Sequence, residues 1–226
     1  MAEKYNTVLI GSWDRSVISW NEKEDKGVEK YWGDHWGFPM VLNGLIEKYS
    51  NNGIGLEVGC GSARLLTRFH KYFKKLYGVD TSTSAIKQSI GRIKELKIKN
   101  IDVSVSDGFT LDKFDDNSLD LVYSQDVFQH FNTSLIYVYL KEFSRVLKTG
   151  GIAIVNFRNI FTDFDRFRSI SNQYAKERPH NFSIWVRYVT PELIKKISDD
   201  VSLNIIERKQ QYEKGNGPEL FVFKKL

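Results

Sequence analysis

Hydrophobic and polar positions alternate with two different periods between residues 40 and 158. Short apolar runs, bounded by Gly, Asn or Asp, predict strands at 54–58, 76–79, 101–105, 119–123 and 152–157. Longer segments with apolar residues three or four positions apart predict helices at 40–49, 63–73, 81–96 and 134–147. Strands that alternate with helices in this way predict right-handed βαβ units, and therefore an α/β fold with a parallel sheet covered by helices on both faces.

The pattern changes near both ends of the chain. Residues 1–40 are aromatic and irregular, and residues 159–189 are rich in aromatic residues and arginine. Thr190 and Pro191 then provide the N-cap and the first position of another helix. Two further strands, at about 202–208 and 219–223, are joined through a Gly-Asn-Gly-Pro turn. A hairpin-like end is unusual for a doubly wound parallel sheet.

Composition is that of an ordinary folded enzyme-sized domain. The 226 residues are 41% hydrophobic and 27% charged, which excludes the disordered class and fits one domain over 1–226. The net charge of +5 is spread along the chain, so no basic stripe for nucleic acid is evident. A single cysteine, no recognisable secretory leader and no apolar run of membrane-spanning length predict a cytoplasmic protein.

A glycine-rich turn follows the first predicted strand and carries the first candidate chemistry. It comprises Gly59, Cys60 and Gly61, where glycine lets the backbone approach a ligand closely. Glu57 stands two residues before the first glycine. A carboxylate at the end of this strand attracts a cationic ligand group and repels a pyrophosphate.

Two more carboxylates follow the next two predicted strands. Asp80 is placed to accept hydrogen bonds from the hydroxyls of a ribose, and Asp107 from an exocyclic amine such as that of adenine. Each aspartate alone is also a common turn residue. Three acids at three successive strand ends favour a ligand site, because ligands of open α/β sheets bind outside the carboxyl ends of strands.

With these motifs in order, the sequence resembles the class I methyltransferases that use S-adenosylmethionine (SAM), in particular those acting on small molecules. The resemblance covers about 40–158 and, more loosely, 186–225. It implies a Rossmann-like, seven-stranded, mostly parallel sheet with an antiparallel last strand, and SAM as cofactor, converted to S-adenosylhomocysteine (SAH). The residues that it implies for SAM binding are Trp13, Glu57, Gly59, Cys60, Gly61, Asp80, Thr81, Asp107, Gly108, Phe109, Ser124 and Gln125.

The chain departs mildly from the family pattern at two positions. Ala63 stands where the family usually has a third glycine, and Thr149 where it usually has proline. We expect the change at Ala63 to matter little, because this residue is predicted to be entering a helix already.

The chemistry implied by the resemblance requires mainly orientation. The sulfonium of SAM activates the methyl group, so that the reaction is an in-line displacement by a correctly placed nucleophile. His130, after the fourth predicted strand, is the candidate general base. The family also uses a histidine here to pack or to line the cofactor, and an acidic acceptor oxygen needs no base. No metal site is expected.

The two irregular segments are expected to form the acceptor pocket. Trp13, Trp20, Tyr31 and Trp32 fit a lid over the site, although aromatic residues also pack segments onto a sheet. Arginine binds carboxylates and phosphates bidentately, so an anionic acceptor is expected, bound above all by Arg187 with Tyr188. Trp32 and Arg158 are the two further residues expected to bind the acceptor. The other polar and aromatic candidates of the second segment are Arg166, Arg168, Arg178, His180 and Trp185.

Three other functions remain open at this point. An NAD-dependent reductase shares the glycine turn and Asp80, but has no need of Glu57. A nucleic-acid methyltransferase of the base-amine type usually carries an Asn/Asp-Pro-Pro-aromatic box after the fourth strand, where this chain has Ser-Gln-Asp-Val-Phe. A SAM-binding protein without catalytic activity would keep the same three acids. The sequence does not set the acceptor or the oligomeric state.

Overall fold

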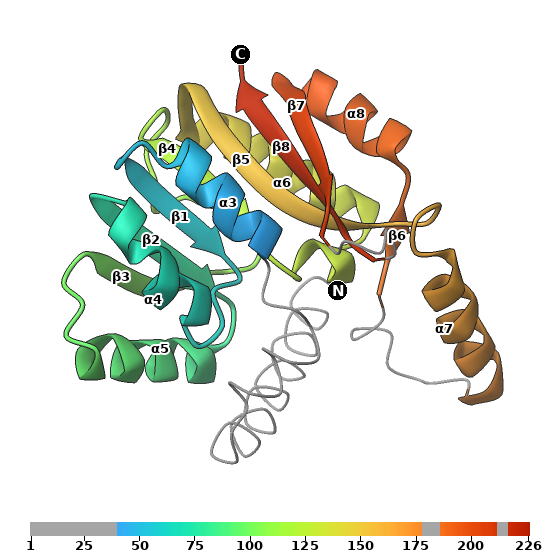
Figure 1. Ribbon diagram of the computed structural model, residues 1–226, viewed down its shortest axis with the longest axis horizontal. Helices are drawn as coiled ribbons and strands as arrows, with labels where there is room; N and C mark the ends of the chain where they lie inside the picture. The colour runs from blue at the N-terminus through green and yellow to red at the C-terminus, as the bar shows by residue number, and fades with distance from the viewer. Residues whose placement is uncertain (1–39, 178–185, 212–216) are drawn as a thin grey trace.

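The computed structural model describes residues 40–177, 186–211 and 217–226 (Figure 1). Its strands are β1 (Ile54–Val58), β2 (Lys75–Asp80), β3 (Ile101–Val105), β4 (Leu119–Ser124), β5 (Leu147–Asn159), β6 (Tyr188–Val189), β7 (Leu203–Gln210) and β8 (Glu219–Lys225). Its helices are α3 (Met40–Tyr49), α4 (Arg64–Phe69), α5 (Thr83–Glu95), α6 (Thr133–Val146), α7 (Phe164–Glu177) and α8 (Pro191–Asp200). Two 3₁₀ turns occur at His70–Tyr72 and Phe128–His130.

The strands form one sheet in the order β3-β2-β1-β4-β5-β8-β7, and the short β6 pairs with the end of β5. Neighbours from β3 to β5 are parallel, whereas β8 is antiparallel to both β5 and β7. The predicted Rossmann-like fold with an antiparallel last strand is therefore confirmed. The two-residue β6 is an addition that the sequence did not predict.

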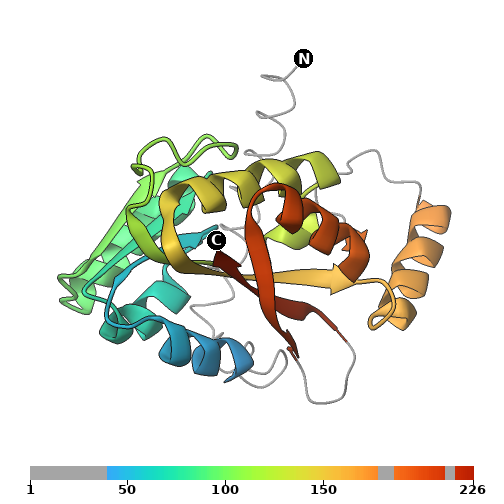
Figure 2. The ribbon, with the colours of Figure 1, turned by 90° about the horizontal axis from the view of Figure 1, so that it is seen from above.

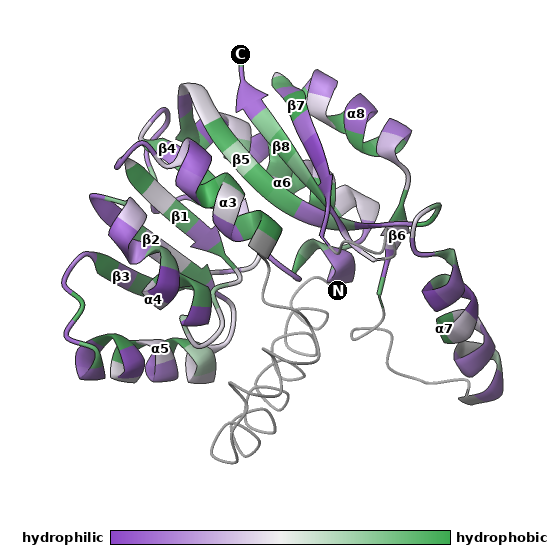
Figure 3. Cartoon of the chain, in the orientation of Figure 1, coloured by the Kyte–Doolittle hydropathy of each residue, from purple (hydrophilic) through white to green (hydrophobic). Residues whose placement is uncertain are grey.

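Helices cover both faces of the sheet, as Figure 2 shows from above. Leu45, Leu66 and Ile86 come from α3, α4 and α5 and belong to the apolar cluster on one face. Ile136 of α6 and Ile197 of α8 belong to the cluster on the other face. Burial on both sides explains why the central strands are almost continuously apolar, which is visible along β5 and β8 in Figure 3.

Local signals fix most element boundaries. The side chains of Ser82, Asn132 and Thr190 accept hydrogen bonds from backbone N–H groups three residues later, at 3.0, 2.9 and 3.3 Å, and so cap α5, α6 and α8. Pro191 occupies the first turn of α8, as the sequence predicted. The helix expected over 63–73 is shorter, because α4 ends at Phe69 and continues as a 3₁₀ turn.

Helix α7 lies in the segment that the sequence left irregular. It extends beyond the end of β5 (Figure 1), and most of its residues are hydrophilic in Figure 3. Phe164 is 52% exposed, and Phe167 contacts Tyr188 of β6 with ring centroids 5.3 Å apart. The apolar residues of α7 are periodic but few, and the many aromatic and arginine residues of this segment led to the prediction of an irregular structure. Among the described residues, no helix is long and apolar enough to cross a membrane.

Candidate functional site

The predicted cofactor residues come together along one edge of the sheet. Strands β3, β2, β1 and β4 are adjacent and parallel, so their carboxyl ends share this edge, and the arrowheads of β1 and β2 lie side by side in Figure 1. The order in which the chain adds strands to the sheet reverses at β1: β2 and β3 lie on one side of it, and β4 and β5 lie on the other. Ligands of open α/β sheets bind at such a switch point, and the glycine-rich turn follows β1 here.

The glycine turn is held by hydrogen bonds within the protein. The N–H groups of Gly59 and Cys60 both donate to the carbonyl of Val79, at 2.8 and 3.1 Å, and that of Gly61 donates to Oδ2 of Asp80 at 2.9 Å. A phosphate-binding loop instead points such N–H groups at the ligand. The turn therefore offers close backbone approach rather than a phosphate cradle.

Gly59 cannot be replaced by a larger residue without a clash. Its φ of +76° lies in the left-handed region, and a Cβ built there would lie 2.2 Å from Cγ2 of Val127. Val127 follows β4, so this contact packs the loop after β4 directly on the glycine turn.

Ala63 corrects one expectation from the sequence. We expected this residue to be entering the helix, but it precedes α4 with φ 62° and ψ 28°, in the left-handed region. Gly59, Gly61 and Ala63 thus all have positive φ. Only glycine adopts this conformation without cost, whereas an L-residue pays about 1–2 kcal/mol, so the departure from the family's third glycine carries backbone strain.

Glu57 is buried in the sheet beside the turn, with 2% of its surface exposed. Its carboxylate accepts a hydrogen bond from the hydroxyl of Tyr123 on β4 at 3.1 Å, a partner that the sequence did not indicate. Burial raises the pKa of Glu57 well above its usual range; the Tyr123 hydrogen bond opposes the shift and the charge of Asp80 adds to it. A cationic group placed nearby would favour the charged carboxylate.

The carboxylate of Asp80 lies between β1 and β2 and is oriented by backbone donors. Oδ2 accepts the N–H of Gly61 and Oδ1 accepts the N–H of Ser82, each at 2.9 Å. Each carboxylate oxygen has two lone pairs, so these bonds are compatible with further donors such as ribose hydroxyls. Thr81 follows Asp80 directly.

Asp107 closes a tight turn two residues beyond β3. Oδ1 accepts the N–H groups of Phe109 and Thr110, both at 2.8 Å, and Oδ2 accepts the Thr110 hydroxyl at 2.9 Å. Burial alone would raise the pKa of Asp107, but the hydrogen bonds from Thr110 and Phe109 lower it overall. The turn role that the sequence allowed for a lone aspartate is therefore present here.

The turn after β3 lies against the residue that follows β2. Gly108 has φ +82°, and a Cβ there would lie 2.9 Å from Cγ2 of Thr81. Phe109 is 36% exposed. The predicted residues Thr81, Gly108 and Phe109 are therefore close to one another at the same edge.

The two candidates after β4 differ in their surroundings. Ser124 is fully buried and donates its hydroxyl to the carbonyl of Val58 at 2.8 Å, so it joins β4 to β1. Both polar atoms of the Gln125 amide are enclosed and make no hydrogen bond to the described part of the chain. A buried amide without partners costs free energy, so Gln125 is the better ligand-binding candidate of the two.

His130 ends the 3₁₀ turn after β4 and is largely enclosed. Burial, and then the charge of Arg158, lower its pKa to about 4. The imidazole is therefore neutral at physiological pH. It can accept a proton, but only as a weak base. His130 could therefore act as the predicted general base only for an acceptor that gives up its proton easily.

Arg158, predicted to bind the acceptor, is engaged within the protein. Its side chain is 5% exposed, and Nη1 lies 2.6 Å from Oδ2 of Asp163, itself 7% exposed. Nε also donates to Oε1 of Gln129 at 2.9 Å. The charge of Arg158 is thus balanced by a partner five residues later, which does not support Arg158 as a free anion-binding group.

Arg187 and Tyr188, two of the predicted acceptor residues, lie beside Arg158. Tyr188 pairs with Arg158 between β6 and β5, and the N–H of Arg187 donates to the carbonyl of Gln129 at 2.6 Å. Nε of Arg187 is enclosed and has no hydrogen-bond partner among the residues that the structure describes. Burial, followed by the charge of Asp163, raises the pKa of Tyr188 to about 12.

Several predicted residues cannot be placed. Trp13, Trp20, Tyr31, Trp32, Arg178, His180 and Trp185 lie outside the described residues. Four side chains that support the site were not predicted from the sequence, namely Tyr123, Gln129, Asn156 and Asp163. Tyr123, Gln129 and Asn156 act through partners 66, 29 and 30 positions away, which only the fold brings near, whereas Asp163 pairs with Arg158 five residues before it.

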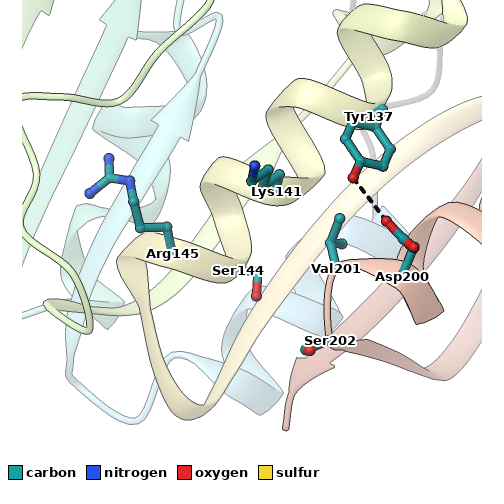
Figure 4. Close-up of a pocket in the computed structure, with 7 residues that line it drawn as sticks. All are labelled: Tyr137, Lys141, Ser144, Arg145, Asp200, Val201 and Ser202. Carbon is teal, nitrogen blue, oxygen red and sulfur yellow. Dashed lines mark hydrogen bonds between the residues drawn. The ribbon is translucent and has the colours of Figure 1, made fainter.

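A shallow pocket of about 270 Å³ lies elsewhere, between α6 and α8 (Figure 4). The hydroxyl of Tyr137 donates to Asp200 at 2.8 Å across it. The ends of α6 and α8 lead into the amino ends of β5 and β7. The pocket is therefore at the opposite edge from the candidate site. In residues 40–177, 186–211 and 217–226, no three His, Cys, Asp or Glu side chains are grouped to hold a metal ion.

Residues 56–155, which span β1 to β5, match the methyltransferase domain family. The match covers less than half of the chain, and it shows that this region is similar to methyltransferase domains. The match covers the glycine turn, Asp80, Asp107 and the loop after β4, so the resemblance inferred from the motifs is confirmed over this range.

Two curated relatives are methyltransferases. Phosphoethanolamine N-methyltransferase 2 of Caenorhabditis elegans is 28% identical over 127 residues, which are 54% of this chain and 27% of that protein. The 2-methyl-6-phytyl-1,4-hydroquinone methyltransferase of Synechocystis sp. is 30% identical over 159 residues, covering 58% of this chain and 47% of that protein. The chain therefore matches half or less of the length of either relative.

Solved structures share the fold at low identity. Magnesium protoporphyrin IX methyltransferase from Synechocystis, with bound SAH, has a TM-score of 0.67 and 14% identity, covering 83% of each chain. Geranyl diphosphate C-methyltransferase from Streptomyces coelicolor has a TM-score of 0.64 and 14% identity, covering 83% of this chain and 78% of that one. These likenesses support the fold.

Proposed function

We propose that this protein is a SAM-dependent methyltransferase that acts on a small-molecule acceptor. The observation that carries the proposal is the set Glu57, Asp80 and Asp107 around a glycine turn, inside a methyltransferase domain. The names of the two curated relatives give small molecules, phosphoethanolamine and a substituted hydroquinone, as their acceptors. Two of the similar structures carry SAH, the product of SAM.

The side chains present at the site suit SAM better than NAD. Glu57, whose carboxyl has a raised pKa, would be stabilised in its charged form by a cationic group of SAM. The unpartnered amide of Gln125 can hydrogen-bond the methionine part, and Asp80 can accept ribose hydroxyls. The N–H groups of the glycine turn already donate within the protein, which does not favour the pyrophosphate of a dinucleotide.

When bound, SAM supplies a methyl group already activated for displacement. The protein's part is then to bind the two reactants, to orient them and to exclude water. Orientation alone can lower the barrier by several kcal/mol, up to about 7–11 kcal/mol. His130, with a pKa of about 4, is neutral and best matched to an acceptor whose nucleophilic atom is already deprotonated or nearly so.

For the acceptor, the proposal extends to an anionic group held by Arg187. Arg158 is balanced by Asp163 and the exposed Arg168 pairs with Asp165, whereas Nε of Arg187 has no hydrogen-bond partner among the described residues. A carboxylate or phosphate would satisfy this buried donor and balance its charge.

Titration calorimetry with SAH and with NAD tests the cofactor. We expect SAH to bind and NAD not to bind. Asp80→Ala should weaken SAH binding by about tenfold or more, since it removes a charged acceptor worth roughly 1.5–3 kcal/mol. Asp102→Ala, which removes an exposed partner of Lys75, is the matched control and should bind SAH as the wild type does. Tight binding of NAD, or equal binding by both variants, would contradict the proposal.

Arg187→Ala tests the acceptor on paired anionic and neutral compounds. Loss of a charge-assisted bond worth about 1.5–3 kcal/mol lowers kcat/KM for the anionic member by about 10- to 100-fold and leaves the neutral member nearly unchanged. Arg168→Ala serves as the control at an exposed site. Equal losses on both compounds would rule out recognition of an anion by Arg187.

A further inference from the structure

Asn156 of β5 joins the strand to the loop after β4 through a reciprocal pair of hydrogen bonds. Its Oδ1 accepts the N–H of Asp126, and its Nδ2 donates to Oδ1 of Asp126, both at 2.7 Å. The same Nδ2 lies 3.3 Å from Oε1 of Gln211, the residue after β7. Asn156 is 1% exposed and its contact with Gln211 is buried, whereas Asp126 is exposed, so the two bonds between Asn156 and Asp126 are part-buried.

Asp126 needs such support because of its backbone. Its φ is 60°, in the left-handed region that costs an L-residue about 1–2 kcal/mol, although Asp and Asn tolerate it better than most residues. Two short hydrogen bonds to one side chain, at least one of them charge-assisted, can offset this cost. The path of the loop therefore depends on Asn156.

The two neighbours of Asp126 in the sequence are at the cofactor site. Val127 packs on Gly59, where a Cβ would come within 2.2 Å of it. Gln125 has the enclosed amide without partners among the described residues. A change in the backbone at Asp126 would move both side chains relative to the glycine turn.

The same loop also leads to the residues that we propose for the acceptor. The carbonyl of Asp126 accepts a hydrogen bond from Nε2 of Gln129 at 3.2 Å, and Oε1 of Gln129 accepts one from Nε of Arg158 at 2.9 Å. The loop that Asn156 holds at Asp126 is therefore also hydrogen-bonded, through Gln129, to Arg158 on the acceptor side.

We propose that Asn156 is a positioning residue for cofactor binding: by holding Asp126 in its left-handed conformation, it sets Gln125 and Val127 against the glycine turn. This inference rests on the proposed function, because it assumes that the glycine turn binds SAM. The hydrogen bond from Asn156 to Gln211 also connects this loop to the end of β7.

A charge exchange between positions 126 and 156 tests the proposal, with SAH binding to the full chain measured by calorimetry. Asn156→Asp places two carboxylates where a hydrogen bond was, and we expect at least tenfold weaker binding. In the double variant Asp126→Asn with Asn156→Asp, the amide now at position 126 can donate to the carboxylate at 156. We expect it to restore affinity to within threefold of the wild type.

Asn159→Asp is the matched control. Asn159 is also in β5, is 3% exposed and donates to a carboxylate, Glu219 Oε2, at 3.0 Å, but makes no contact with the loop after β4 in the described bonds. Both single variants should lose stability in urea, whereas only Asn156→Asp should lose SAH affinity. If Asn156→Asp does not fold, Asn156→Ala against Asn159→Ala gives the same comparison.

Unchanged SAH affinity in Asn156→Asp, an equal loss in Asn159→Asp, or a folded double variant without recovery would each overturn the positioning role while leaving the proposed function intact. A wild-type protein that binds no SAH would overturn both. The two failures are therefore distinguishable.

Discussion

The buried ion pair between Arg158 and Asp163 gives a sharp test of how this part of the protein is stabilised. The two side chains are 5% and 7% exposed, and their charged atoms are 2.6 Å apart. Asp163→Asn keeps the size and one hydrogen-bond acceptor but removes the negative charge. The guanidinium of Arg158 then stays buried without a counter-charge, because Oε1 of Gln129, which accepts a hydrogen bond from its Nε, is neutral.

The expected loss follows from this geometry. Breaking one partner of a buried pair costs about 3–5 kcal/mol, mostly from the charge left behind. The control is Asp165→Asn, which breaks the pair with Arg168 two residues further on, where the side chains are 65% and 81% exposed. Exposed pairs contribute about 0–1 kcal/mol, so this variant should unfold almost as the wild type does.

Urea unfolding followed by circular dichroism measures both variants at pH 7. A third variant, Arg158→Met with Asp163→Leu, removes both charges and should recover most of the loss, since apolar residues often replace a buried pair at little cost. The reasoning would be refuted if Asp163→Asn lost less than about 1 kcal/mol, or no more than Asp165→Asn.

Two further predictions follow from the site. Gly59→Ala should abolish SAH binding, because its Cβ would lie 2.2 Å from Val127. Gly61→Ala has nothing within 4 Å of its Cβ and meets only backbone strain, so it should bind SAH measurably but more weakly than the wild type. Calorimetry that ranks the two variants in reverse would contradict this. The pKa of His130 is lowered to about 4 from 6.5, so the unfolded chain binds the proton more strongly and stability falls as the pH drops from about 6.5 towards 4. Urea unfolding at pH 7 and pH 5 should show a drop about 1–2 kcal/mol larger for wild type than for His130→Asn, and equal drops would argue against a neutral, enclosed imidazole.

The sheet and the cofactor edge could be predicted because their signals are local. An apolar run that ends in glycine or aspartate marks both a strand and its carboxyl end, so Asp80 and the glycine turn were found together. Ser82 and Thr190 cap helices within three residues, which is equally local. Such features need no knowledge of the tertiary fold.

Features that depend on distant partners could not be predicted in the same way. Tyr123 reaches Glu57 across 66 positions, and Asn156 reaches Asp126 across 30, so neither pairing leaves a pattern in the chain. The left-handed backbone at Ala63 was missed because alanine normally favours a helix. Helix α7 was missed although its periodicity matches that of α6, because its polar, arginine-rich composition was interpreted as an irregular segment.

The reversal of strand order at β1 also has a consequence for how such a protein can change over time. The glycine turn and Asp107 follow β1 and β3, and Asp80 ends β2, whereas Arg158 lies near the end of β5 and Arg187 directly precedes β6, on the other side of the reversal. Arg158 is joined to the loop after β4 through Gln129, whereas Nε of Arg187 has no hydrogen-bond partner among the described residues, so substitutions of the Arg187 side chain need not disturb the first group. A fold built in this way would allow side chains on one side of the reversal to change while the glycine turn, Asp80 and Asp107 on the other side stay the same.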